Sequence, residues 1–183
     1  NKELLFFVKA LIAVSQEFGL HRQNYLFTVE NNDNGDNGWS GNGNGKNSRI
    51  ATVRFHGVNL NKPDYNPYSH SLALEVNEPD NGRHLYLAIS SYWKDLDFAL
   101  PAAPEGESWH KIIDTSLSYP DDIVNVSDAE AIESDKLKVP ARSVCILANT
   151  KCFTSSKHDI KEWAREKLND DRSLKITWTG INI

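Results

Sequence analysis

The sequence predicts a mainly β protein: an antiparallel β-sandwich of about six to eight strands, Greek-key-like, with one N-terminal helix and one C-terminal helix. Two observations support this fold class. Short segments of alternating apolar and polar residues recur over residues 50–149, separated by turn residues such as those at 79–82. Apolar residues have helical spacing at 2–18 and again at 155–169.

The segment 2–18 predicts a helix that is buried on much of its circumference. Gly19 is a suitable residue to end it. A helix with so many apolar side chains needs a large partner surface, which we expect upstream of it in a complete protein; without that partner, we expect the helix to pack on the sandwich or on a second copy of the chain. Its apolar positions are Leu4, Leu5, Phe6, Phe7, Val8, Ala10, Leu11, Ile12 and Val14.

Residues 31–48 form an insert dominated by Asn and Gly. Such a segment buries too little apolar surface to offset the entropy of ordering it, so it predicts a flexible loop. Its Asp and Asn residues raise the alternative of a calcium site, but the acidic ligand that an EF-hand needs is not at the required spacing.

The segments expected to form strands follow this insert. Several alternate with a period of two, for example Leu72, Leu74 and Val76. A further alternating segment begins at 174, after the helix expected at 155–169, where Ser155 can cap the first turn. The expected strands of the sandwich are 50–55, 71–76, 84–90, 96–100, 109–114 and 138–148.

Composition excludes several classes of partner. The formal net charge is −5, which disfavours nucleic acid and anionic membranes because both attract basic surfaces. Cys145 lies in an apolar strand-like segment and predicts a buried free thiol, and with Cys152 it suggests a reducing compartment. The His and Cys residues do not have zinc-site spacing, so neither a metal nor a cofactor is predicted.

The most specific pattern spans several segments in a fixed order. VRFHGVNLNKPDY at 53–65 is followed by SLALEV, HLYLAISSYWKDLDFALP, SWHKIIDTS and VPARSVCIL. In order and spacing, these segments resemble the C-terminal domain of isoamylase-type glycogen and starch debranching enzymes of the α-amylase superfamily. The resemblance covers residues 3–148. Two departures are Tyr65, where the family usually has Trp, and Ser90 or Ser91, where it often has Asn.

The resemblance implies a division of the chain. Residues 1–22 resemble the last helix of the family's (β/α)8 barrel, and 50–149 resemble its β-sandwich. The insert 31–48 is a loop, and 150–183 form a helix–strand tail of unknown role. Because the chain opens inside the expected barrel helix, we expect a fragment of a longer protein.

The implied parent reaction is hydrolysis of α-1,6-glucosidic branch linkages. A retaining glycosidase needs two carboxyl groups about 5 Å apart across one cleft, and the family's catalytic carboxylates lie on the barrel. None of its catalytic motifs occurs here, so no catalytic residue is predicted and the chain alone is not expected to be an enzyme. The expected role is to stabilise the barrel, in the cytoplasm or, in a plant, the plastid. The alternatives are a free-standing α-glucan-binding module and a non-catalytic scaffold homologue.

Exposed aromatic residues beside hydrogen-bonding side chains are typical of carbohydrate sites. The candidate carbohydrate-binding residues are Asp64, Tyr65, Asn66, Tyr68 and Trp93, four of them in one expected loop. The competing interpretation is that this loop packs against the barrel, as interface aromatics do. For Trp93, as for Trp109, packing at the core or edge of a strand pair is the competing interpretation.

Two histidines, His56 and His110, are possible general bases. Neither has a Ser or Cys at a motif spacing, so structural roles are expected for both. Asp114, followed by Thr115 and Ser116, is expected to form a turn with side chains bonded to nearby backbone, rather than to belong to a nucleophilic site.

Overall fold

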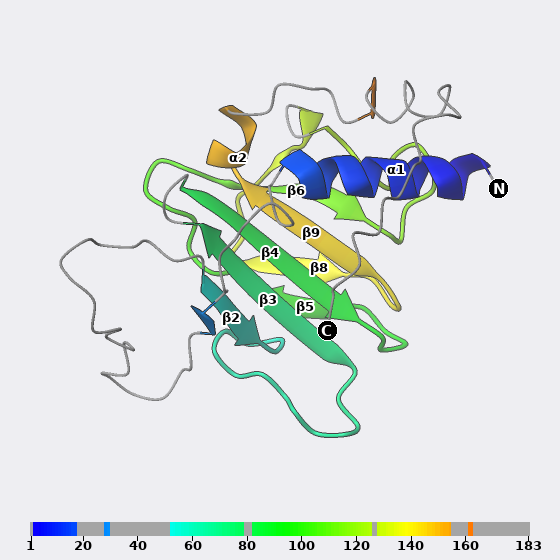
Figure 1. Cartoon of the computed structure of the whole chain (residues 1–183). Helices are drawn as coiled ribbons and strands as arrows, with labels where there is room; N and C mark the ends of the chain where they lie inside the picture. The colour runs from blue at the N-terminus through cyan, green and yellow to red at the C-terminus, as the bar shows by residue number, and fades with distance from the viewer. Residues whose placement is uncertain are drawn as a thin grey trace, which may run out of the picture.

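The computed structural model describes residues 2–17, 28–29, 52–78, 82–125, 128–154 and 161–162. Strands are the main regular structure of the described chain, and a single long helix precedes them (Figure 1). The elements are α1 (Lys2–Glu17), β1 (Thr28–Val29), β2 (Thr52–His56), β3 (Ser71–Glu78), β4 (Arg83–Ser90), β5 (Leu96–Ala99), β6 (Trp109–Asp114), β7 (Ala131–Ile132), β8 (Lys136–Val139), β9 (Val144–Asn149) and α2 (Lys151–Thr154).

Seven strands form one large sheet in the order β1-β2-β3-β4-β9-β6-β7, and β5 pairs with β8 in a second, small sheet. All the pairs are antiparallel except β1 with β2. In the β3–β4 hairpin Ser71 lies opposite Ser90, and Gly82 adopts a φ of 62° at its turn. Strand β9 lies between β4 and β6 and pairs with both, although it is distant from them in the sequence.

One face of the large sheet packs on the small sheet. Phe98 of β5 and Val139 of β8 are fully buried there against Tyr86 and Leu147 of the large sheet. Side chains alternate between the two faces of a strand, and in each sheet these residues lie on the face that is turned to the other sheet. The predicted antiparallel sandwich is therefore confirmed.

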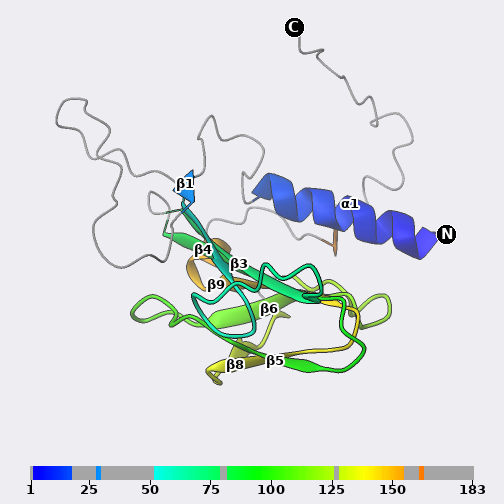
Figure 2. The same cartoon turned by 90° about the horizontal axis from the view of Figure 1, so that it is seen from below.

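The opposite face of the large sheet is partly covered by α1, so that the sheet lies between the helix and the small sheet (Figure 2). Phe6, Ala10 and Val14 of α1 pack on a cluster that includes Leu85 and Ile113. The predicted helix is confirmed, but the expectation that much of its circumference is buried is wrong. The sheet contacts one side of the helix, while another apolar side remains exposed: Leu4, Leu5, Val8, Leu11 and Ile12.

The segment 138–148 is not one strand, as predicted, but parts of two. Strand β8 ends at Val139, and β9 begins at Val144. Between them Pro140 lacks the N–H that a strand ladder uses, and Arg142 adopts a φ of 54°. The two halves consequently join different sheets.

The short strand β7 and the helix α2 were not predicted. The insert 31–48 and the strand expected from 174 lie outside the described residues, as does most of the C-terminal helix expected at 155–169. Cys145 is a buried free thiol as predicted, and Cys152 is a second one.

Candidate functional site

The loop between β2 and β3 contains most of the candidate residues, and local hydrogen bonds give it a defined shape. Asp64 Oδ1 accepts a hydrogen bond from the backbone N–H of Asn66 at 3.0 Å, and Asn66 Oδ1 accepts one from that of Tyr68 at 2.9 Å. These successive Asx turns hold the backbone while the two tyrosines project outward. Tyr65 is 76% exposed and Tyr68 is 84% exposed.

A glycine sets the start of this loop. Gly57 is buried, and a Cβ atom at this position would collide with the backbone carbonyl oxygen of Lys62. The chain therefore folds back on itself immediately after β2. Asn61 adopts a φ of 59° within the same bend, and its backbone N–H donates a hydrogen bond to Nδ1 of His56 at 2.8 Å.

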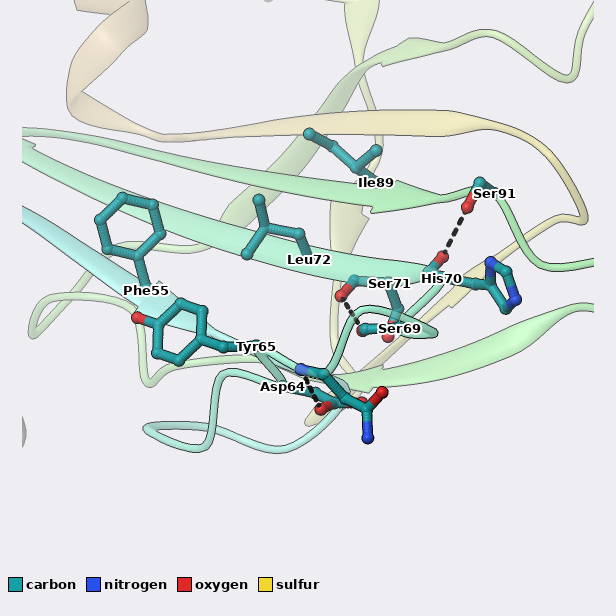
Figure 3. Close-up of a pocket in the computed structure, with 10 residues that line it drawn as sticks. Phe55, Asp64, Tyr65, Ser69, His70, Ser71, Leu72, Ile89 and Ser91 are labelled. Atoms are coloured by element: carbon teal, nitrogen blue, oxygen red, sulfur yellow. Dashed lines mark hydrogen bonds between the residues drawn. The ribbon is translucent and has the colours of Figure 1, made fainter.

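An open pocket of about 400 Å³ lies between this loop and the strands (Figure 3). Phe55, Leu72 and Ile89 are its apolar residues, one from each of β2, β3 and β4. Its polar lining combines a carboxylate, an amide, an imidazole, a phenol and hydroxyls, the groups that bind a neutral hydroxylated ligand. The polar lining residues are Asp64, Tyr65, Asn66, Ser69, His70, Ser71 and Ser91.

Hydrogen bonds connect His70, just before β3, to Ser91, just after β4, on the wall of the pocket. The carbonyl oxygen of His70 accepts a hydrogen bond from the backbone N–H of Ser91 at 2.8 Å and one from its hydroxyl at 3.2 Å. Figure 3 shows the bond between these two residues beside Ser69 and Ser71. His70 is thereby fixed next to the turn that contains Tyr92 and Trp93.

A group of aromatic rings adjoins the pocket at His70. The ring centroids of Tyr92 and Trp93 are 4.0 Å apart, and His70 lies 6.2 Å from Tyr92 and 6.0 Å from Trp93. Trp93 is 58% exposed, so the core position considered for it is wrong. Trp109 does occupy the core, where its Nε1–H donates a hydrogen bond to the carbonyl oxygen of Pro101 at 2.8 Å.

The structure thus brings most of the sequence-predicted residues together. Asp64, Tyr65 and Asn66 line the pocket, and Trp93 adjoins it through His70, whereas Tyr68 lies on the same loop without lining it. Sequence reasoning missed His70, Ser91 and the stacking of Tyr92 on Trp93. The hairpin register was the available signal: Ser71 opposite Ser90 sets His70 beside Ser91.

A polar cluster lies on the other face of the same sheet, between β2, β3 and β4. His56 is 1% exposed, and its Nε2 is 3.3 Å from Oε2 of Glu75, which also accepts a hydrogen bond from Arg54 at 3.2 Å. The hydrogen bond from His56 and the charge of Arg54 hold the pKa of Glu75 below its usual value, although burial acts in the opposite direction. Burial lowers the pKa of His84, despite the carboxylates Glu75 and Glu107 nearby. These contacts give His56 the structural role expected for it.

The remaining candidates are also structural. Asp114 Oδ1 accepts hydrogen bonds from the backbone N–H of Ser116 at 3.1 Å and from its hydroxyl at 2.6 Å, which is the turn that was predicted. Burial raises the pKa of Asp114, but hydrogen bonds from Lys111 and Ser116 outweigh it and lower the pKa. His110 Nδ1 is 2.8 Å from the carbonyl oxygen of Ala129.

A second candidate surface is the outer side of α1, which we call the outer stripe: Leu4, Leu5, Val8, Leu11 and Ile12. Leu4 is 59% exposed, and all five side chains are more exposed than is usual for a helix packed between layers. Neighbouring apolar side chains left in water on one helix face indicate an interaction surface.

Within the described segments, no three or more His, Cys, Asp or Glu side chains are grouped so that they could hold a metal ion. No described helix has the length and apolar character needed to cross a membrane.

Comparison with known proteins agrees with the resemblance seen in the sequence. The profile of the family "Isoamylase 1-3, C-terminal" matches residues 54–155, which include the pocket, the aromatic group and β3 to β9 of the sandwich. Isoamylase 3, chloroplastic, from Oryza sativa subsp. japonica is 34% identical over 59 residues. The aligned segment is 32% of this chain and 8% of that relative, so most of the relative has no counterpart in the alignment. This chain belongs to the isoamylase 1-3 C-terminal domain family.

Proposed function

We propose that this chain is the non-catalytic C-terminal β-sandwich of a glycogen or starch debranching enzyme that hydrolyses α-1,6-glucosidic branch linkages. Its function is to stabilise the catalytic (β/α)8 barrel of that enzyme. In this proposal residues 1–22 supply the last helix of the barrel, and the protein acts in the plastid, the compartment named for the rice relative.

The observation that supports this proposal best is the two-sided apolar character of α1. Its inner side packs on the large sheet through Phe6, Ala10 and Val14, and its outer stripe is exposed. A helix with two apolar sides is stable between two layers, and this chain provides one of them. The rice relative, of which the aligned segment is 8%, has ample further chain to provide the other.

The chemistry of the pocket supports a non-catalytic role. Cleavage with retention needs a nucleophilic carboxylate and a second carboxylic acid about 5 Å away. Among the described residues that line the pocket, Asp64 is the single carboxylate, and its Oδ1 is already bonded to the Asn66 N–H. We therefore expect the chain by itself to release no reducing ends from a branched glucan.

The proposal is tested with the double variant Val8→Asp/Ile12→Asp, which places two charges on the outer stripe. In the full-length protein that contains this chain, the variant should lower the melting temperature and the debranching activity, because the charges would be buried against the barrel. In the chain alone, at a protein concentration low enough for it to be monomeric, it should leave the melting temperature unchanged, because both side chains are exposed there. Leu117→Asp, an exposed apolar position in the turn after β6, is the matched control.

Loss of stability in the chain alone would assign the outer stripe to the sandwich and contradict the proposal. A full-length double variant with the melting temperature and debranching activity of the wild type would contradict the proposal as well. Without its partner layer, the chain should self-associate through the same stripe, as measured by sedimentation velocity. The double variant should then be monomeric.

The exposed aromatic side chains favour a second candidate function. A free-standing α-glucan-binding module, or a non-catalytic scaffold homologue, would also use Tyr65 and Trp93, which are both exposed beside hydrogen-bonding groups. Such a module would need no barrel, so this alternative predicts that charges on the outer stripe change neither the stability nor the activity of the full-length protein.

A further inference from the structure

We infer that the aromatic group His70–Tyr92–Trp93, together with the adjoining end of the pocket, is a surface binding site for a neutral α-glucan chain. The inference rests on the proposed function for the identity of the glucan. It goes further in assigning a ligand contact to the sandwich itself, separate from any contact with the barrel.

The first support is the presentation of Trp93. Its ring is supported by Tyr92 at 4.0 Å, yet the residue remains 58% exposed. A supported, exposed ring loses little conformational entropy when a pyranose ring stacks on it through its C–H groups.

The second support is the rigidity of the turn that holds these rings. The backbone N–H of Tyr92 donates a hydrogen bond to the hydroxyl of Ser90 at 3.3 Å, and its carbonyl oxygen accepts one from the N–H of Arg142 at 3.0 Å. Asp95 Oδ1 accepts a further hydrogen bond from the N–H of Ala141 at 3.2 Å. The aromatic turn is therefore fastened to the β8–β9 connection and is preorganised for a ligand.

The third support is the placing of hydrogen-bonding groups next to the rings. The lining of the pocket includes both His70 and Ser91, and the bonds between these residues use the His70 carbonyl oxygen. The imidazole ring of His70 takes no part in these two hydrogen bonds. Sugar hydroxyls need such groups beside an apolar platform.

Charge and ring geometry select the class of ligand. The described residues that line the pocket include one acidic side chain, Asp64, and neither Lys nor Arg, which disfavours phosphate, nucleic acid and other anions. The ring of Trp93 is inclined by 33° to Tyr92 and by 63° to His70, so the group is not flat. A group that is not flat suits a curved α-linked chain better than the flat surface of packed, extended β-linked chains.

The site and α1 lie over different edges of the large sheet. Figure 1 shows α1 over β6 and β9, and the loop between β2 and β3 at the opposite end of the large sheet. The pocket lies over β2, β3 and β4 at that end. Leu72 and Ile89 of the pocket share the face of the sheet on which Leu85 packs against α1, so the site lies beside α1 on that face, towards the β2 edge.

The test is affinity electrophoresis of the whole 183-residue chain in gels with and without glycogen, with calorimetric titration of maltoheptaose. Trp93→Ala should weaken both interactions about tenfold, the loss expected for one stacked ring. Leu117→Ala, at an exposed apolar position that does not line the pocket, should leave them unchanged. Urea unfolding of Trp93→Ala should match the wild type, because the side chain is exposed and its removal creates no cavity.

Three results would overturn the inference: no binding of the wild-type chain at millimolar maltoheptaose, equal affinity of the wild type and Trp93→Ala, or equal affinity for cellohexaose. The same variant in the full-length protein separates this inference from the proposed function. If Trp93→Ala lowers the melting temperature there and leaves glycogen affinity unchanged, the rings contact the barrel and the glucan site is wrong, while the proposed function stands. If Val8→Asp/Ile12→Asp has no effect in the full-length protein but Trp93→Ala abolishes glycogen binding, the proposed function fails and the glucan site stands.

Discussion

Nε2 of the buried His56 lies 3.3 Å from Oε2 of Glu75, and Nδ1 of the same ring accepts a hydrogen bond from the N–H of Asn61. Because Nδ1 is an acceptor, the ring proton is on Nε2 and is donated to the carboxylate. One nitrogen of the His56 ring therefore connects β2 to β3, and the other orders the bend that begins the loop between β2 and β3.

Replacement of Glu75 by Gln is expected to lower the free energy of unfolding by about 1–3 kcal/mol, because the donors of His56 and Arg54 lose a charged acceptor in a buried site. Urea denaturation measures the change. Glu130→Gln, an exposed position, is the control. A double-mutant cycle with His56→Ala should show coupling between the two positions, and additive effects would refute the contact as a source of stability.

The same cluster predicts a dependence of stability on pH. His84 has a pKa below its ordinary 6.5, so the unfolded chain takes up a proton first and stability falls as the pH falls below that value. Glu75 has a pKa below its ordinary 4.5, so its contribution is present above that value and is lost as the pH falls through the folded-state pKa.

The midpoint of urea unfolding, followed from about pH 7 to about pH 3, should therefore fall in two stages. His84→Gln should reduce the first stage, and Glu75→Gln the second. A pH profile of His84→Gln that coincides with that of the wild type would contradict this assignment.

The two sides of α1 should respond differently to truncation in the chain alone. Phe6 is buried against the sheet and meets Tyr119 edge-to-face, with ring centroids 5.1 Å apart. Phe6→Ala should cost about 3 kcal/mol or more through the cavity that it leaves. Leu4→Ala, on the outer stripe, should cost less than about 0.5 kcal/mol. Equal losses by thermal and urea denaturation would show that the helix is packed differently.

The two thiols should be inert in the native protein. Burial raises the pKa of Cys145 to about 12 and that of Cys152 to about 12, so little of either is thiolate near neutral pH. An aromatic disulfide reagent should therefore leave both thiols unmodified in buffer and modify both in denaturant. Rapid reaction of the native chain would place at least one thiol at the surface.

Gly57→Ala is expected to destabilise the loop between β2 and β3 by about 1–3 kcal/mol, because the new methyl group overlaps the carbonyl oxygen of Lys62. Gly106→Ala is an informative comparison: its Cβ meets no atom within 4 Å, but its φ is 77°. The Gly57→Ala substitution creates a steric overlap, whereas Gly106→Ala forces an alanine into a left-handed backbone conformation. Only Gly57→Ala should also change the exposure of Tyr65, which hydroxyl-radical footprinting read out by mass spectrometry reports.

Much of the fold was determined by local pattern in the sequence. The alternation of Leu72, Leu74 and Val76 defines a two-faced strand wherever that strand lies, and the Asx chemistry of Asp64 and Asn66 defines a loop. These features depend on neighbours in the chain, so they were predictable without knowledge of distant contacts. The division of 138–148 into two strands was missed, although Pro140 was its signal.

The tertiary structure decided which faces are buried. The apolar repeat of 2–18 does not distinguish the Phe6 side from the Leu4 side, and the choice depends on the shape of the sheet below. Likewise, Trp93 and Trp109 are equivalent in the sequence, but one is exposed and the other is in the core. The meeting of His70 with Trp93 needs the pairing of β3 with β4. Burial and contact depend on chain segments that are far apart in sequence, so one-dimensional periodicity cannot specify them.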